Sequence, residues 1–195
     1  DHASPAQLGG AASDALLLEA MKTVGRVVTA VGDDTPLSPD SIQQGHLTLS
    51  PNDDHVARAV PLFIAQGPQM TPSFGLALYA LAKNQPLADV TGDRHLLNPV
   101  GNGTLADLPA IPLSSVWDAI RRHDNAALDG WFKGNVAVIL PQAASQTPWL
   151  LPTGQSVDGM TAHLHLLNNL LTGNRICRIG AAGRGGLAIV VAALV

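Results

Sequence analysis

The first candidate for chemistry is a serine near two histidines and an aspartate in the last third of the chain. Residues 154–158 read Gly-Gln-Ser-Val-Asp, which departs from the nucleophile elbow G-x-S-x-G at its final glycine, here Asp158. Ser156 with His163 or His165 gives one functional hypothesis, a soluble α/β hydrolase-type enzyme. That hypothesis requires a strand, a turn and a helix around Ser156. Because the second glycine is missing, we keep it as the alternative and assign no catalytic residue.

The histidines and the single cysteine argue against a metal site. His163 and His165 are two residues apart in a predicted helix, so their side chains point in nearly opposite directions. We expect one to pack near the core and the other to meet solvent. Cys177 is the only cysteine, which excludes an internal disulfide and a cysteine-based zinc site. Asp53 and Asp54 lack the spacing of a calcium loop and predict a simple turn.

Nucleotide cofactors and nucleic acids are not expected as partners. Residues 101–106 fit the loose dinucleotide pattern G-x-G-x-x-A, but prolines follow at 109 and 112, where the pattern needs a helix. We therefore predict a loop there and no cofactor. The chain has 11 Lys plus Arg and 15 Asp plus Glu, a net charge of −4. Such a balance creates no strong positive field, which argues against nucleic acid.

The composition fits one core-forming domain and raises the question of a membrane. Of 195 residues, 46% are hydrophobic and only 13% are charged. Residues 185–195 carry no charge, whereas a spanning helix needs about 20 apolar residues. The run is either a final buried strand or helix, or the start of a transmembrane helix, which we favour. Arg175, Arg178 and Arg184 lie beside it, and positive residues usually mark the cytoplasmic side, which counts against an outside-facing domain.

The elements that must position these residues follow from the hydrophobic periodicity. Predicted helices cover 13–24, 71–84, 114–122 and 159–171, and predicted strands cover 26–31, 46–49, 55–65, 95–97 and 135–140. Strands 46–49 and 55–65 form an antiparallel hairpin, with Pro61 marking an edge or a bulge. The nearly all-apolar run 135–140 predicts a central strand covered on both faces. The predicted fold is α/β, a mixed sheet with helices on both faces, a β-hairpin insertion and the start of a C-terminal transmembrane helix.

Three stretches carry an ordered series of motifs. Residues 45–62 hold a glycine, a strand, an acidic turn, an arginine and Pro-Leu; residues 131–140 read WFKGNVAVIL; residues 157–173 read VDGMTAHLHLLNNLLTG. In this order and spacing the chain resembles the type-2 CHASE domain, an extracytoplasmic sensory domain of bacterial transmembrane receptors. The resemblance covers nearly all of the chain and lacks the first strands of the family.

The resemblance implies a sensory domain over residues 1–176 and a link to a transmembrane helix over residues 177–195. Such a domain lies on the periplasmic or extracellular side of the cell membrane and is not itself an enzyme. It responds to a small-molecule or protein signal, works as a homodimer, and relays a conformational change to a cyclase or kinase output. A third hypothesis is a purely structural or assembly module, which predicts no ligand pocket.

One loop departs from the family pattern and could hold a ligand. The glycine that the family has after the central strand is Pro141 here. Ligands of open α/β sheets bind beyond the carboxyl ends of strands. We therefore name Gln142 and Ser145 as candidate ligand-binding residues, with His163 or Asn168 close to them. Each also has an ordinary structural role, namely loop hydration for the first two and helix packing for the others.

Overall fold

The structure is a computed structural model that describes residues 10–31, 42–49, 54, 56–66, 69–87, 92, 94–99, 109–140, 148–174 and 176. Its helices are α1 (Gly10–Val24), α2 (Phe74–Lys83), α3 (Leu113–Arg121), α4 (Asn125–Phe132) and α5 (Gly159–Thr172). Its strands are β1 (Val28–Val31), β2 (Gln43–His46), β3 (Ala59–Pro61), β4 (Phe63–Gln66), β5 (Gln69–Pro72), β6 (Arg94–Leu96), β7 (Trp149–Leu150) and β8 (Ser156–Val157).

The strands form four two-stranded sheets within the described part of the chain. β1 and β2 pair in parallel, whereas β3–β6, β4–β5 and β7–β8 are antiparallel pairs. Helices are thus combined with both strand orientations, as the α/β prediction requires. The prediction of one mixed sheet with helices on both faces is wrong for these residues.

The run predicted as the central strand explains much of this difference. Residues 135–140 form no helix and no strand in the structure. Val138 packs against a core cluster, but Ile139 is 81% exposed and Leu140 is 47% exposed. A strand is stabilised only when neighbouring strands pair with its backbone, and this segment has no such neighbour among the described residues. Apolar composition alone therefore predicted the strand wrongly.

The predicted hairpin of strands 46–49 and 55–65 is also wrong. The first strand lies three residues earlier, as β2, and pairs with β1 in the register Val28↔Gln43. The second is interrupted at Leu62, whose carbonyl accepts a hydrogen bond from Ser73 N at 2.7 Å. Pro61 has no N–H to continue a ladder, which agrees with its predicted edge or bulge position. The actual hairpin is formed by β4 and β5.

Helix α2 ends where the sequence predicted, but it begins later than predicted. Thr71 and Pro72 belong to β5 rather than to the first turn, and Ser73 is the N-cap residue. The register Phe63↔Pro72 binds this segment to β4, and that pairing prevails over the local preference of proline for a helix start. Asn84 ends the helix as predicted, in the left-handed conformation with φ 52°.

The last helix confirms its predicted boundaries. The Asp158 carboxylate caps α5 by accepting a hydrogen bond from Thr161 N at 2.6 Å. Gly173 ends the helix with φ 69°, a conformation that costs glycine little. The predicted end of the helix 13–24 is confirmed, because Gly25 has φ 66° directly after α1, whereas the helix begins at Gly10, three residues before its predicted start. Local capping signals therefore fixed these helix ends.

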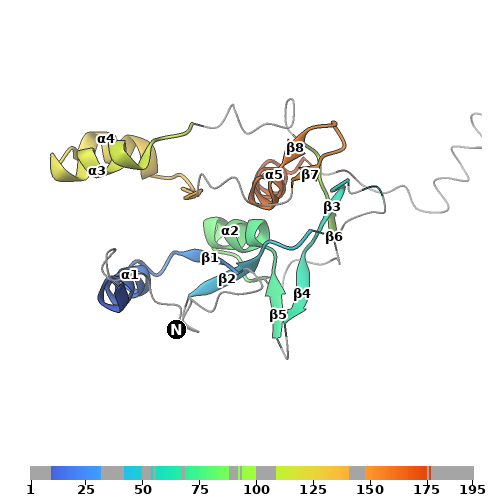
Figure 1. Ribbon diagram of the computed structural model, residues 1–195, viewed down its shortest axis with the longest axis horizontal. Helices are drawn as coiled ribbons and strands as arrows, with labels where there is room; N and C mark the ends of the chain where they lie inside the picture. Colours follow the sequence, from blue (N-terminus) through green and yellow to red (C-terminus); the bar gives the residue numbers. More distant parts are fainter. Residues whose placement is uncertain are drawn as a thin grey trace, which may run out of the picture.

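The core forms where α2 and α5 pack side by side (Figure 1). Ala162, Leu166 and Leu170 of α5 join one apolar cluster with Leu76 of α2. Leu164 and Leu167 join a second cluster with Phe74 and Leu78 of α2. Helix α5 thus supplies side chains to both clusters, and movement of this helix disturbs both.

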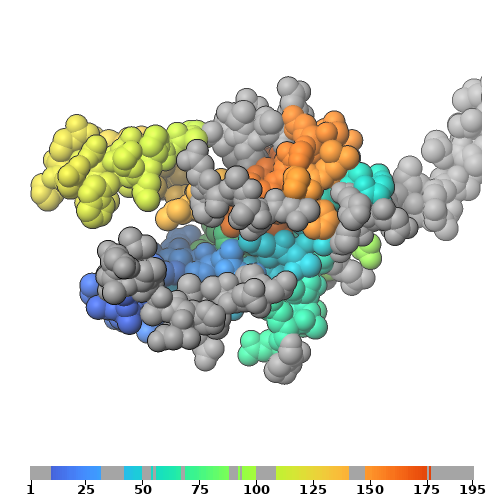
Figure 2. Space-filling view, in the orientation of Figure 1, coloured from blue at the N-terminus to red at the C-terminus, as the bar shows by residue number. Residues whose placement is uncertain are grey.

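Other elements extend from this core. Helices α3 and α4 project from one side of the molecule, and the β4–β5 hairpin projects from another (Figures 1 and 2). Helix α1 buries none of its side chains. None of the helices in the described ranges is long and apolar enough to cross a membrane. The predicted transmembrane start over residues 177–195 lies outside the described residues.

Candidate functional site

Three polar side chains meet in the core between β2, α2 and α5. His46 is the last residue of β2 and forms a parallel bridge with Ser73, the N-cap residue of α2. His163 lies in the second turn of α5, and its ring stands edge-to-face to that of His46 with 5.8 Å between centroids. All three side chains are fully buried. We call these residues the histidine cluster.

No polar side-chain atom of the histidine cluster makes a hydrogen bond of good geometry, although backbone at Pro61 lies close to the His46 ring and backbone at positions 47 and 48 lies close to the His163 ring. This holds for both ring nitrogens of His46 and of His163 and for the Ser73 hydroxyl. Burial lowers the pKa of His46 to about 4, while the backbone of Pro61 opposes the shift. Burial lowers the pKa of His163 to about 4 as well, His46 adds to this effect, and backbone at positions 47 and 48 opposes it. Both rings are therefore neutral at pH 7.

Backbone around the histidine cluster is packed without spare room. A Cβ added at Gly75 of α2 would lie 2.4 Å from the His163 carbonyl oxygen. A Cβ added at Gly45 of β2 would lie 2.5 Å from the Cα of Phe74. Both separations are too short for real atoms, so the absence of a side chain is what permits β2, α2 and α5 to approach this closely.

A second polar contact fixes the other half of α5. Asn169 is fully buried, and its side-chain amide binds the backbone of Asn98 in the stretch after β6. Asn169 Nδ2 donates to the Asn98 carbonyl oxygen at 2.8 Å, and Asn169 Oδ1 accepts from Asn98 N at 2.9 Å. These two hydrogen bonds have the pattern of a backbone pair in a β-ladder, and they hold α5 against the chain that follows β6.

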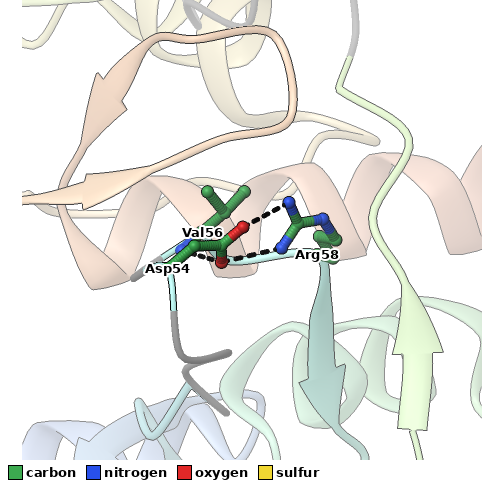
Figure 3. A network of polar contacts seen from close by, with 3 residues as sticks. All are labelled: Asp54, Val56 and Arg58. Atoms are coloured by element: carbon green, nitrogen blue, oxygen red, sulfur yellow. Dashed lines mark hydrogen bonds and ion pairs between the residues drawn. The ribbon is translucent and has the colours of Figure 1, made fainter.

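A third polar group lies at the surface before β3 (Figure 3). The Asp54 carboxylate accepts hydrogen bonds from Arg58 Nη1 at 2.9 Å and Nη2 at 2.6 Å, and from Val56 N at 3.1 Å. The hydrogen bonds from Arg58, and then that from Val56 N, lower the pKa of Asp54 to about 2. This geometry satisfies the carboxylate within the turn, which agrees with the predicted turn at this position rather than a cation site.

A model of the CHASE2 domain matches residues 1–195, the whole chain. The chain belongs to the CHASE2 domain family. The resemblance inferred from its motifs is thereby confirmed, and the family is one of extracellular sensory domains of signalling receptors. No curated protein and no solved structure matches this chain.

The predicted ligand residues of this CHASE2 domain are only partly described. Gln142 and Ser145 lie outside the described residues. His163 is fully buried, and Asn168 is partly exposed on the same helix. His165 is fully buried too, so the expectation that one histidine meets solvent is wrong. Residues 162–167 are all buried, because α5 is covered on nearly every side rather than on one face.

The local fold around Ser156 agrees with the hydrolase alternative, but Ser156 does not form a dyad with His163. Ser156 lies in β8, Asp158 caps the helix and α5 follows, so a strand does lead into a helix here. However, Ser156 is exposed whereas His163 and His165 are fully buried. Neither nitrogen of His163 has a hydrogen-bond partner, so Ser156 does not contact that base. In this arrangement His163 does not activate Ser156.

The described residues contain no cluster of three or more His, Cys, Asp or Glu side chains able to hold a metal ion.

A shallow groove of about 360 Å³ lies at the C-terminal end of α2, lined by Gln43, Ala80, Leu81, Asn84, Gln85, Pro86 and Leu87. Sequence analysis assigned no functional role to His46, Ser73 or Asn169. Their partners are distant along the chain, and only folding brings them together.

Proposed function

We propose that this CHASE2 domain is the extracytoplasmic ligand-sensing part of a membrane receptor. In this proposal it relays a conformational change to a cyclase or kinase output elsewhere in the protein. The observation that carries the proposal is the family match over all 195 residues, because the family consists of extracellular sensory domains. Residues 1–176 are the sensory domain in this proposal, and residues 177–195 lead into a transmembrane helix.

The packing of α5 supports its role as the relay. This helix is the last element described, so it precedes the proposed membrane link in the chain. It contributes Leu166 to one core cluster and Leu167 to the other, and Asn169 ties it to Asn98. A ligand that favours one arrangement of the core therefore also favours one position of α5.

The proposal also includes the signal that the domain binds and the oligomeric state of the receptor. The signal is a small molecule or a protein, and the loop with Gln142 and Ser145 contributes to its binding. The receptor works as a homodimer. Exposed apolar side chains on α3 support an assembly surface, since Leu113 is 68% exposed, Trp117 60% and Ile120 47%.

Cysteine labelling of the intact protein in its native cells tests the location. Cys177→Ser, together with replacement of any cysteine elsewhere in the intact protein, provides a background without cysteine. Into this background Thr153→Cys introduces a thiol at an exposed position between β7 and β8. A membrane-impermeant maleimide added to whole cells is expected to label this thiol. Ser73→Cys is the matched control, because Ser73 is fully buried and should react only after denaturation. Labelling of Thr153→Cys only after lysis would place the domain in the cytoplasm and refute the proposal.

The output of the intact receptor tests the relay. Gly75→Ala forces α2 away from the backbone of α5, and Gly130→Ala on α4 meets no atom within 4 Å. We expect Gly75→Ala to change the unstimulated output activity, and Gly130→Ala to leave it unchanged. Equal activity of both variants, with the Gly75→Ala protein correctly folded, would exclude α5 as the relay.

A further inference from the structure

We propose that His46 and His163 form an acid-operated switch, in which protonation of the pair separates α5 from β2 and α2. The proposed switch makes a fall in pH a signal to which the domain responds, which goes beyond the proposed function. It concerns the folded domain itself and holds whether or not the receptor relay exists.

The composition of the histidine cluster is what makes the contact sensitive to protons. Leucine or phenylalanine would fill the same space and bury no polar atom, whereas His46, Ser73 and His163 bury five without partners. Histidine differs from those residues because its ring gains a charge in the mildly acidic range. Two rings with centroids 5.8 Å apart would then repel one another in a medium that screens charge poorly.

Among the described residues of the elements that pack around the rings, no charge of opposite sign stabilises the protonated form. Within their bounds, β1, β5 and β3 carry no titratable side chain, and β2 carries only His46. Helix α2 contributes Tyr79, which is half-buried, and Lys83, which is exposed at its far end. Helix α5 contributes His163 and the fully buried His165. None of these elements carries a carboxylate, and the backbone near the rings at positions 47, 48 and 61 offsets their lowered pKa only in part. A protonated ring is therefore better stabilised by water than by the closed core.

Water cannot reach the rings while the elements stay packed. The close approaches at Gly75 and at Gly45 leave no layer of solvent between α5, α2 and β2. Hydration of an imidazolium therefore requires α5 to move away from the other two elements. The structure thus couples one chemical event, proton uptake, to one mechanical event, release of α5.

The direction and size of the effect follow from the two states. In the closed state both pKa values are lowered from 6.5 to about 4, whereas the open state has the ordinary value. The open state binds more protons between these values, so the closed state is lost as the pH falls below 6.5, and the loss is complete below about pH 4. Each histidine favours opening by roughly 20-fold between pH 7 and pH 5.

Amide hydrogen exchange of the full 195-residue chain at pH 7 and pH 5 tests the switch. Rates are corrected for the intrinsic pH dependence of exchange, and the amides of α3 serve as the internal reference. We expect the protection of α5 amides to fall by about 20-fold or more at pH 5, as expected for uptake of at least one proton. The double variant His46→Phe, His163→Phe should keep its protection.

A matched control and a second measurement complete the test. His123→Asn removes an exposed histidine at φ 55°, which asparagine tolerates, and should behave like the unmodified chain. If the double variant fails to fold, NMR titration of the unmodified chain decides, with two histidine rings expected to titrate below 6.5 and the α5 amide resonances expected to change at the same midpoint. Unchanged α5 protection at pH 5, equal loss in the double variant, or midpoints near 6.5 for all rings would overturn the proposal.

Discussion

Replacement of Asn169 by alanine tests whether α5 is held by the backbone of the chain after β6. The two hydrogen bonds to Asn98 are 2.8 Å and 2.9 Å long, and Asn169 is fully buried. The variant removes both bonds and leaves the Asn98 N–H and carbonyl without their partner. Asn168→Ala is the matched control, because Asn168 is adjacent on the same helix and its side chain is partly exposed.

The size of the effect can be worked from these contacts. A buried backbone group that loses its partner costs about 1–3 kcal/mol, so two groups cost about 2–6 kcal/mol. Asn98 is partly exposed, so water restores some of this loss and we expect about 3 kcal/mol. Alanine has a higher helix propensity than asparagine by about 0.5 kcal/mol, a gain that both variants share. The difference between them therefore isolates the contact with Asn98.

Urea unfolding followed by tryptophan fluorescence measures this difference. Asn169→Ala is expected to lower the free energy of unfolding by about 3 kcal/mol, and Asn168→Ala to change it by less than about 0.5 kcal/mol. Equal stability of the two variants would refute the reasoning, because it would mean that the buried amide contact with Asn98 contributes nothing. If only Asn169→Ala lowered the slope of the unfolding free energy against urea concentration, α5 would be unfolding before the rest of the domain.

Three further predictions follow from single contacts. Gly75→Ala should destabilise the domain by about 1–3 kcal/mol in the same assay, since its Cβ meets the α5 backbone, whereas Gly130→Ala should be neutral or stabilising. The carboxyl of Asp54 should titrate near pH 2 by NMR, and Arg58→Ala should return it toward 3.8, so this ion pair is lost only as the pH falls through about 2. Ile139→Lys should change the free energy of unfolding by less than about 0.5 kcal/mol, because that side chain is 81% exposed. A loss typical of a core residue would instead support the prediction that residues 135–140 form a buried central strand.

Part of this structure follows from short stretches of sequence. Asp158 and Gly173 mark the ends of α5, and Asn84 and Gly25 mark the ends of two other helices, because caps satisfy backbone groups within a few residues. The membership of the CHASE2 family is likewise a property of the ordered motifs, which the match over the whole chain confirms. These signals are local or linear, and no tertiary contact is needed to recognise them.

The pairing of strands and the site depend on contacts across the chain. The apolar run 135–140 has the composition of a central strand, but no described strand pairs with it. His46 and His163 are far apart in sequence and touch only because β2, α2 and α5 pack together. The sequence by itself thus determined the C-terminal ends of α1, α2 and α5, the start of α5 and the family, since these rest on neighbouring residues. Only the tertiary structure decided which strands pair and which polar groups are buried, since a hydrogen-bond ladder and a dry core both require partners from distant segments.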